Sequence, residues 1–211
     1  MGQIVTLEVF RKGREDRVRL GLEDGGTHDF DAELAVKFHW RRGLVFNEAQ
    51  WRDWLAEEER LAARRAILAH LTLRKKSAEE ARRWLAAKGY SKEASDVAVE
   101  IARERGFLDD RAYAEGIVKR RTKSAPMGIR ALQHELETRG IDPTDAAPAL
   151  APLEDFTHQR QQATEQARER FAKLKDLTQE KALRRLADFL ARKGYDEEVV
   201  REVAEEIAGD Q

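Results

Sequence analysis

Three short clusters of lysine and arginine lie between residues 74 and 123 of this 211-residue chain. Their members share a cationic side chain that can bind phosphate oxygens or carboxylates, and they are Arg74, Lys75, Lys76, Arg82, Arg83, Lys119, Arg120, Arg121 and Lys123. A solvated helix face, or cations near a helix C-terminus, would explain any one cluster. Because all three fall in one part of the sequence, we expect a surface for nucleic-acid phosphates or for an acidic protein.

The net charge of −1 conceals a polarised distribution along the chain. Residues 60–90 hold nine basic and two acidic residues, a local charge of +7. The residues after Gly194 hold seven acidic residues and one arginine, a local charge of −6. We therefore expect the first region to bind an anionic surface and the C-terminal region to repel one.

Other kinds of chemistry find little support in the residue types and their spacing. Asp109 and Asp110 could act as paired carboxylates, for acid–base catalysis or for magnesium, but they directly precede a helical pattern and are explained as helix caps. The five histidines are dispersed, and no glycine-rich phosphate loop is present. We therefore expect a protein that is not an enzyme and that uses no metal and no cofactor.

The composition favours a helical protein of the cytoplasm. The chain contains no cysteine, which excludes disulfides and zinc–thiolate sites and fits a reducing compartment. No stretch approaches the roughly 20 apolar residues of a membrane helix, and the first ten residues lack the apolar core of a signal peptide. Charged residues make up 37% of the chain, which suits narrow apolar stripes on many helices better than a deep central sheet.

The front of the chain predicts a small β-structure followed by helices. Alternating apolar residues indicate strands over residues 3–10 and 17–22, with a short third strand near residues 27–30. A helix is expected over residues 31–42, ending at Gly43. Another begins after Asn47 as N-cap and continues to about residue 72, either unbroken or interrupted near residues 57–59.

The rest of the chain repeats one pattern of three helices. In each copy one helix ends at a glycine, within Lys88-Gly89-Tyr90, Arg139-Gly140-Ile141 and Lys193-Gly194-Tyr195. A leucine stands four residues before each glycine, at 85, 136 and 190. The predicted fold is therefore mainly α: a tandem array of three three-helix repeats, preceded by a small extension that contains a β-hairpin. The predicted domains are 1–58 for the extension, and 59–106, 107–153 and 154–211 for the repeats.

Local signals predict the helix ends within the repeats. Ser77-x-x-Glu80 forms a capping box, and Pro126 is a favourable first helical residue. A further helix is indicated over about residues 143–150, although Pro148 would interrupt it by removing a hydrogen bond from its interior. The pattern does not define how the second repeat packs against the third.

One motif resembles a known family. The run Gly106-Phe-Leu-Asp-Asp-Arg-Ala-Tyr-Ala, followed by Arg120-Arg121, is similar to the hallmark of the RecX regulators of the RecA recombinase. Residues 66–71, the turn at 74–77, Lys88-Gly89-Tyr90 and residues 135–141 resemble the first two repeats of that family, and the strand-rich front resembles its N-terminal extension. The resemblance covers nearly the whole chain and is specific between about residues 63 and 141.

The resemblance implies a non-enzymatic regulator in homologous recombination, DNA repair and the SOS response. Such proteins bind the RecA filament on single-stranded DNA, inhibit its ATPase and strand-exchange activity, and modulate filament assembly and disassembly. The nine basic residues named above would then contact the filament; whether single- or double-stranded DNA is touched directly stays open. We expect no membrane partner, and a monomer, because the three repeats can cover one another.

Two other functions also fit the residues. One is a helix-turn-helix-like protein that binds duplex DNA directly, because three-helix units have that spacing. The other is a helical adaptor whose charges only keep it solvated. In that case, reversing the charges of Arg74, Lys75 and Lys76 would leave its binding activities intact.

Overall fold

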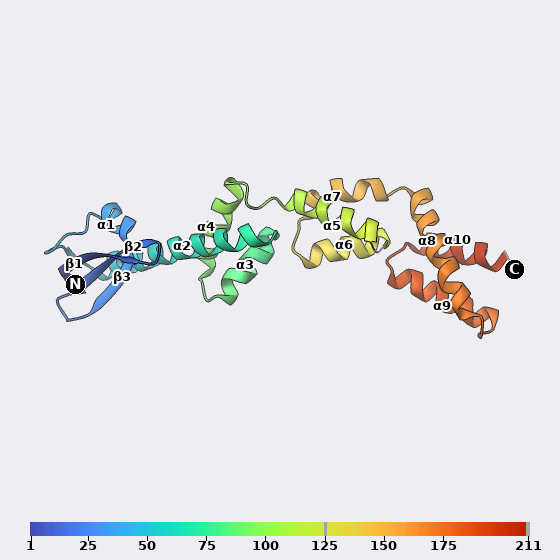
Figure 1. Ribbon diagram of the computed structural model, residues 1–211, viewed down its shortest axis with the longest axis horizontal. Helices are drawn as coiled ribbons and strands as arrows, with labels where there is room; N and C mark the ends of the chain where they lie inside the picture. The colour runs from blue at the N-terminus through green and yellow to red at the C-terminus, as the bar shows by residue number, and fades with distance from the viewer. Residues whose placement is uncertain (125, 210–211) are drawn as a thin grey trace. The chain divides into compact units, whose positions relative to one another are not determined.

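The computed structural model of the protein describes residues 1–124 and 126–209, and these residues form two units (Figure 1). The first unit comprises Met1–Arg74 and Ala81–Leu108. The second comprises Lys75–Glu80 and the described chain from Asp109 onward. Helices dominate both units, and strands occur only at the front of the described chain, so the predicted fold class is confirmed.

The front of the first unit is a four-stranded antiparallel sheet. Its order is β3-β2-β1-β4, with β1 at Gly2–Lys12, β2 at Glu15–Leu22, β3 at Thr27–Asp31 and β4 at Val45–Phe46. Val18 on β2 stands opposite Val9 on β1 and Phe30 on β3. The three predicted strands are confirmed. Strand β4 was not predicted, because two residues are too few to show an alternating pattern.

One face of the sheet is covered by aromatic residues from the segments that follow β3. Val18, Leu20 and Phe30 are at most 1% exposed on this face. Trp54 on α2 (Glu48–Leu73) lies 4.9 Å from both the Trp40 and the Phe46 ring centroids. The hairpin, which would be marginal alone, is therefore stabilised by burial of large aromatic surfaces.

Helix α1 (Ala32–Lys37) is shorter than the predicted helix over residues 31–42. Asp31 is its N-cap and accepts a hydrogen bond from the Glu33 amide. The helix ends because His39 has a positive φ of 53°, which a right-handed helix cannot continue. This turn directs Trp40 back into the core, where it is 7% exposed.

Helix α2 is continuous over 26 residues and does not break near residues 57–59. Asn47 caps it as predicted, in a reciprocal capping box with Gln50. The later part of α2 packs against α4 (Lys92–Glu104), as Figure 1 shows. Helix α3 (Ala78–Ala87) places the Trp84 ring on His70 of α2, with centroids 4.2 Å apart. The predicted boundary at residue 58 falls inside α2 and stays a prediction.

The second unit holds six α-helices among its described residues. They are α5 (Asp110–Ser124), α6 (Ile129–Thr138), α7 (Pro143–Leu150), α8 (Phe156–Phe171), α9 (Gln179–Arg192) and α10 (Glu197–Gly209). Short 3₁₀ turns, η1 (Ala151–Leu153) and η2 (Ala172–Leu174), follow α7 and α8. The first three helices share one apolar core and the last three share another. Each repeat in this unit therefore buries an apolar stripe of its own.

The same backbone motif ends α3, α6 and α9. Their closing glycines have φ values of 90°, 70° and 83° at Gly89, Gly140 and Gly194. In each case the amide after the glycine donates to the carbonyl of the leucine five residues earlier, at 3.2, 3.1 and 3.3 Å. The three leucines, Leu85, Leu136 and Leu190, are at most 1% exposed. These are Schellman caps, and they confirm the repeat that the glycines predicted.

The expected start of one helix at Pro126 was wrong, whereas the helix expected over residues 143–150 is confirmed. Helix α6 begins at Ile129 rather than Pro126, because the backbone of Gly128 is extended (φ −68°, ψ 162°) and acts as N-cap. Helix α7 forms despite Pro148. It has only eight residues, and the amide of Ala151 still donates to the carbonyl of Ala147, so the proline removes only the single bond that its own amide would have donated.

Candidate basic interface

The first unit contains three of the nine predicted binding residues. Arg74 follows the end of α2 and is exposed. Arg83 is exposed on α3, whereas the Nε atom of Arg82 donates to Asp96 Oδ1 at 2.9 Å. A hydrogen bond from Lys92, supported by that from Arg82, holds the pKa of Asp96 below its ordinary value. The charge of Arg82 is thus balanced by Asp96 within the same unit, while Arg74 faces solvent.

Lys75 and Lys76 lie in the turn before α3 and belong to the second unit. Lys75 is exposed, and Lys76 Nζ lies 3.7 Å from Glu80 Oε1. The predicted capping box is confirmed: the Glu80 amide donates to Ser77 Oγ at 3.0 Å, and the Ser77 amide donates to Glu80 Oε2 at 3.2 Å. This box fixes the backbone that presents the two lysines.

The two aspartates at the start of α5 have different roles. Asp109 caps the helix, because its Oδ1 accepts from the Ala112 amide at 2.8 Å. Asp110 Oδ1 instead accepts from the Ala78 amide at 2.9 Å, at the start of α3. The capping interpretation is therefore confirmed for Asp109. Asp110 instead provides an acceptor for a backbone amide in the first turn of α3, which has no partner within its own helix. The sequence did not indicate this role.

The end of α5 presents three exposed cations and one that is used internally. Lys119, Arg120 and Lys123 are exposed and form no ion pair with any described residue. Arg121 binds Glu135 of α6 through Nε at 2.8 Å and Nη2 at 3.0 Å. That hydrogen-bonded guanidinium holds the pKa of Glu135 below its ordinary value. Arg121 therefore joins α5 to α6 and is less available to a partner than its three neighbours.

The basic residues of the second unit lie at opposite ends of α5. Asp110 contacts the turn region through Ala78. At 1.5 Å per residue, Lys119 and Lys123 lie about 13 and 20 Å further along the helix axis. The predicted residues of this unit therefore do not form one patch, and a partner would contact them at two separate places.

Within the second unit, a polar network around Arg139 joins α5 and α6 to Glu80 in the first turn of α3. Its Nη1 atom lies 3.0 Å from the Tyr113 hydroxyl and 3.3 Å from Glu80, and its Nη2 atom lies 3.0 Å from Glu135. Burial, and then the charge of Glu80, raise the pKa of Tyr113. Sequence reasoning missed this network, although Tyr113 and Arg139 both belong to the motifs that carry the family resemblance.

In the second unit, two residues that each precede a helix donate a hydrogen bond to the C-cap residue of another helix. Ser77, the residue before α3, donates from Oγ to the Arg139 carbonyl at 2.5 Å. Gly128, the residue before α6, donates from its amide to the Lys193 carbonyl at 2.9 Å. Arg139 and Lys193 are the C-caps of α6 and α9, each just before its closing glycine. The bond between Gly128 and Lys193 joins the second repeat to the third and defines their packing, which the sequence left undefined.

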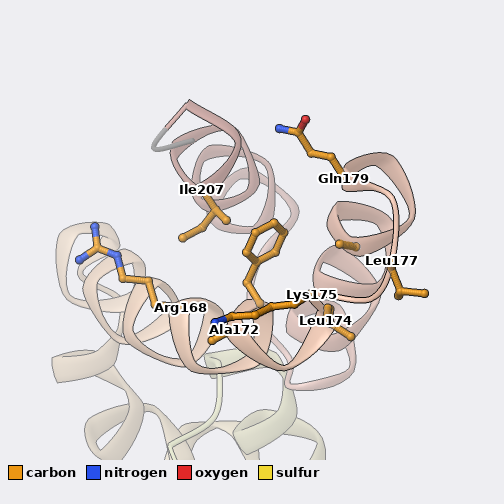
Figure 2. Close-up of a pocket in the computed structure, with 9 residues that line it drawn as sticks. Arg168, Ala172, Leu174, Lys175, Leu177, Gln179 and Ile207 are labelled. Atoms are coloured by element: carbon orange, nitrogen blue, oxygen red, sulfur yellow. The ribbon is translucent and has the colours of Figure 1, made fainter.

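The third repeat contains a groove of about 600 Å³ between the end of α8, the start of α9 and the end of α10 (Figure 2). Its lining is mostly apolar and is Arg168, Phe171, Ala172, Leu174, Lys175, Leu177, Gln179, Ala182 and Ile207. The lining includes no carboxylate, and Arg168 also pairs with Glu206 at 3.2 Å. The groove therefore presents apolar surface with cations at its edge.

No group of histidine, cysteine, aspartate or glutamate side chains within residues 1–124 and 126–209 is arranged to hold a metal ion. Across the same ranges, no helix combines the length and the apolar character needed to cross a membrane.

Comparisons with known proteins identify the family. The model of the second three-helix domain of RecX matches residues 109–150, and that of the third matches residues 158–204. The Regulatory protein RecX of Amycolatopsis mediterranei is 34% identical over 139 residues, which cover 66% of this chain and 79% of that protein. The protein of the same name from Bacillus licheniformis is 26% identical over 196 residues, covering 93% and 74%.

Two solved structures share the fold. A crystal structure of regulatory protein RecX superposes with a TM-score of 0.75 at 17% identity, over 97% of this chain and all of that one. The RecX of Lactobacillus salivarius superposes with a TM-score of 0.63 at 16% identity, over 72% of this chain and 98% of that one. The sequence relatives and the domain matches agree with this fold. The chain therefore belongs to the RecX family of regulatory proteins.

Proposed function

We propose that this protein regulates the RecA recombinase by binding its filament on single-stranded DNA in the cytoplasm. Binding inhibits the ATPase and strand-exchange activity of RecA and shifts the balance between filament assembly and disassembly. The protein acts as a monomer and performs no catalysis of its own. Membership of the RecX family supports the regulatory role, and the filament as partner rests on the family resemblance.

The observation that carries the proposal is the placement of five exposed, unpaired cations within the repeats. Arg74 and Lys75 flank the turn before α3, and Lys119, Arg120 and Lys123 lie at the end of α5. Because these side chains form no ion pair among the described residues, binding a phosphate or a carboxylate breaks no existing pair. Lys76, Arg82 and Arg121 already have internal partners, so we expect them to contribute less.

The test is RecA-catalysed ATP hydrolysis on single-stranded DNA with increasing amounts of this protein. The wild type is compared with the double variant Arg74→Glu/Lys75→Glu. A control, Lys12→Glu/Arg14→Glu, makes the same change in net charge at the exposed turn between β1 and β2. We expect inhibition by the wild type and the control, and weaker inhibition by the repeat variant.

Each alternative function gives a different result. A direct duplex-binding protein would bind duplex DNA in a sequence-dependent way without recombinase and leave ATP hydrolysis unchanged. A helical adaptor would show equal behaviour in the wild type and both variants. Absence of inhibition by folded wild-type protein at low salt would overturn the proposal for the recombinase tested.

A further inference from the structure

The exposed face of α9, in the third repeat, is a cationic stripe. Residues 181, 184, 185, 188 and 192 recur at helical spacing, and at 100° per residue they fall within an arc of about 100°. The opposite face packs into the core, where Ala182, Leu186 and Leu190 are at most 3% exposed. The stripe is defined as the four cations of this arc, Lys181, Arg184, Arg185 and Arg192.

The stripe is not neutralised by the acidic residues that follow it. Glu202 and Glu206 on α10 pair instead with α8, where Arg160 lies 3.4 and 3.0 Å from them. No cation of the stripe forms an ion pair with any residue the structure describes, and its only acidic neighbour within the arc is Asp188. The acidic side chains of α10 that pair with α8 therefore leave the four cations of the stripe without a partner in the described part of the chain.

The stripe lacks the features of a protein-binding surface. Protein interfaces are anchored by aromatic or large apolar residues at their centres. Along the exposed face of α9 the only uncharged residue between Lys181 and Arg192 is Ala191. The Phe189 ring is covered by cations, with Arg170 at 5.6 Å and Lys193 at 5.8 Å from its centroid. It is therefore not a free platform for stacking a base.

We propose that the α9 stripe binds the phosphate backbone of a nucleic acid directly, without help from a recombinase. Three of its four cations are arginines, whose forked donors match phosphate oxygens. Lys173 and Lys175 are exposed just before α9 and extend the cationic surface; Figure 2 includes Lys175 at the groove. Since no aromatic side chain on this face is free to stack a base, we expect phosphate contacts to dominate and binding to depend little on base sequence.

The test measures binding of fluorescein-labelled oligothymidine to the full chain by anisotropy, over salt concentrations from about 50 to 200 mM. The stripe variant replaces all four cations with glutamine: Lys181→Gln, Arg184→Gln, Arg185→Gln and Arg192→Gln. A matched control removes four exposed, unpaired cations from the first unit: Lys12→Gln, Arg14→Gln, Arg41→Gln and Arg42→Gln. Both variants change the net charge equally, so only the position differs.

We expect the stripe variant to flatten the plot of log affinity against log salt by about 3 units, because each phosphate contact contributes about 0.7 on single strands. The control should keep the wild-type slope, and oligoadenosine should bind like oligothymidine. If the fourfold variant fails to fold, Arg184→Gln/Arg185→Gln should lose about half as much slope.

Three results would overturn the assignment. The first is a slope of log affinity against log salt that is as steep in the stripe variant as in the control. The same result in the double variant, if that is the one tested, would have the same meaning. The second is a strong preference for one base composition. The third is wild-type protein that ignores DNA at low salt but binds polyglutamate through the stripe, which would assign this face to an acidic protein.

Discussion

Replacing Gly128 by alanine tests the backbone contact that joins the second and third repeats. A Cβ atom at this position would lie 2.1 Å from the Gly194 carbonyl oxygen and 2.3 Å from the Tyr195 amide nitrogen. Both neighbours are backbone atoms, so no side chain can move aside. The φ of −68° at Gly128 suits any residue, and the whole effect of the substitution therefore comes from this contact.

The expected cost follows from the geometry. Ordinary contact begins near 3.4 Å, so the two backbones must separate by about 1.3 Å. That movement breaks two hydrogen bonds, from the Gly128 amide to Lys193 at 2.9 Å and from the Arg130 amide to Gly194 at 3.1 Å. Overpacking and the lost bonds together destabilise the junction by about 2–5 kcal/mol.

Urea unfolding followed by circular dichroism measures this loss, and hydrogen exchange at the Arg130 amide locates it. The control is Gly116→Ala in α5, where an added Cβ meets nothing within 4 Å. Because alanine favours helix, the control should stabilise the protein by about 0.5–1 kcal/mol. An unchanged urea midpoint in Gly128→Ala, together with unchanged protection of the Arg130 amide, would refute the reasoning.

Three further predictions concern polar groups. Ser77→Ala removes the hydrogen bond to the Arg139 carbonyl and one half of the capping box. The free energy of unfolding in urea should fall by about 1–2 kcal/mol. Ser77→Thr keeps a hydroxyl and should retain most of the wild-type stability. Glu135 has a lowered pKa because of Arg121, so its stabilising effect is present above its unfolded pKa and lost as pH falls through its folded pKa. Unfolding free energies should therefore drop more between neutral and acidic pH in the wild type than in Glu135→Gln; equal drops would contradict this. Burial raises the pKa of Tyr195 to about 12, so ultraviolet titration should show a late phenol ionisation that is missing in Tyr195→Phe.

The sequence predicted the repeat well because its signals are local. A glycine that ends a helix, as Gly89 and Gly140 do, depends on backbone conformation within one turn. The capping box at Ser77 likewise needs only residues three apart. Such features are visible in a single stretch of sequence, and the structure confirms them.

The features that the sequence did not reveal depend on contacts between distant segments. Gly128 starts α6 in place of Pro126 because its amide bonds to a residue 65 positions later. Arg121 was predicted to face a partner, yet Glu135 on the next helix binds it. Neither of these contacts can be recognised from the residues next to it in the sequence. The functional roles of the nine basic residues stay predictions, and the sequence analysis did not single out the cations of α9, which are spaced along one helix face rather than clustered in sequence.

The junction between repeats also bears on how such a protein can change over evolution. Its central hydrogen bonds at Gly128 and Gly194 join backbone atoms. Every residue except proline supplies the same backbone donor and acceptor, so most side-chain substitutions leave these groups in place. We expect sequence change to be restricted mainly at Gly128 and Gly194, where a side chain would keep the two backbone segments apart. A RecX structure with a TM-score of 0.75 at 17% identity fits this tolerance. Side chains on the surface of each repeat can therefore be exchanged without any change in these backbone hydrogen bonds.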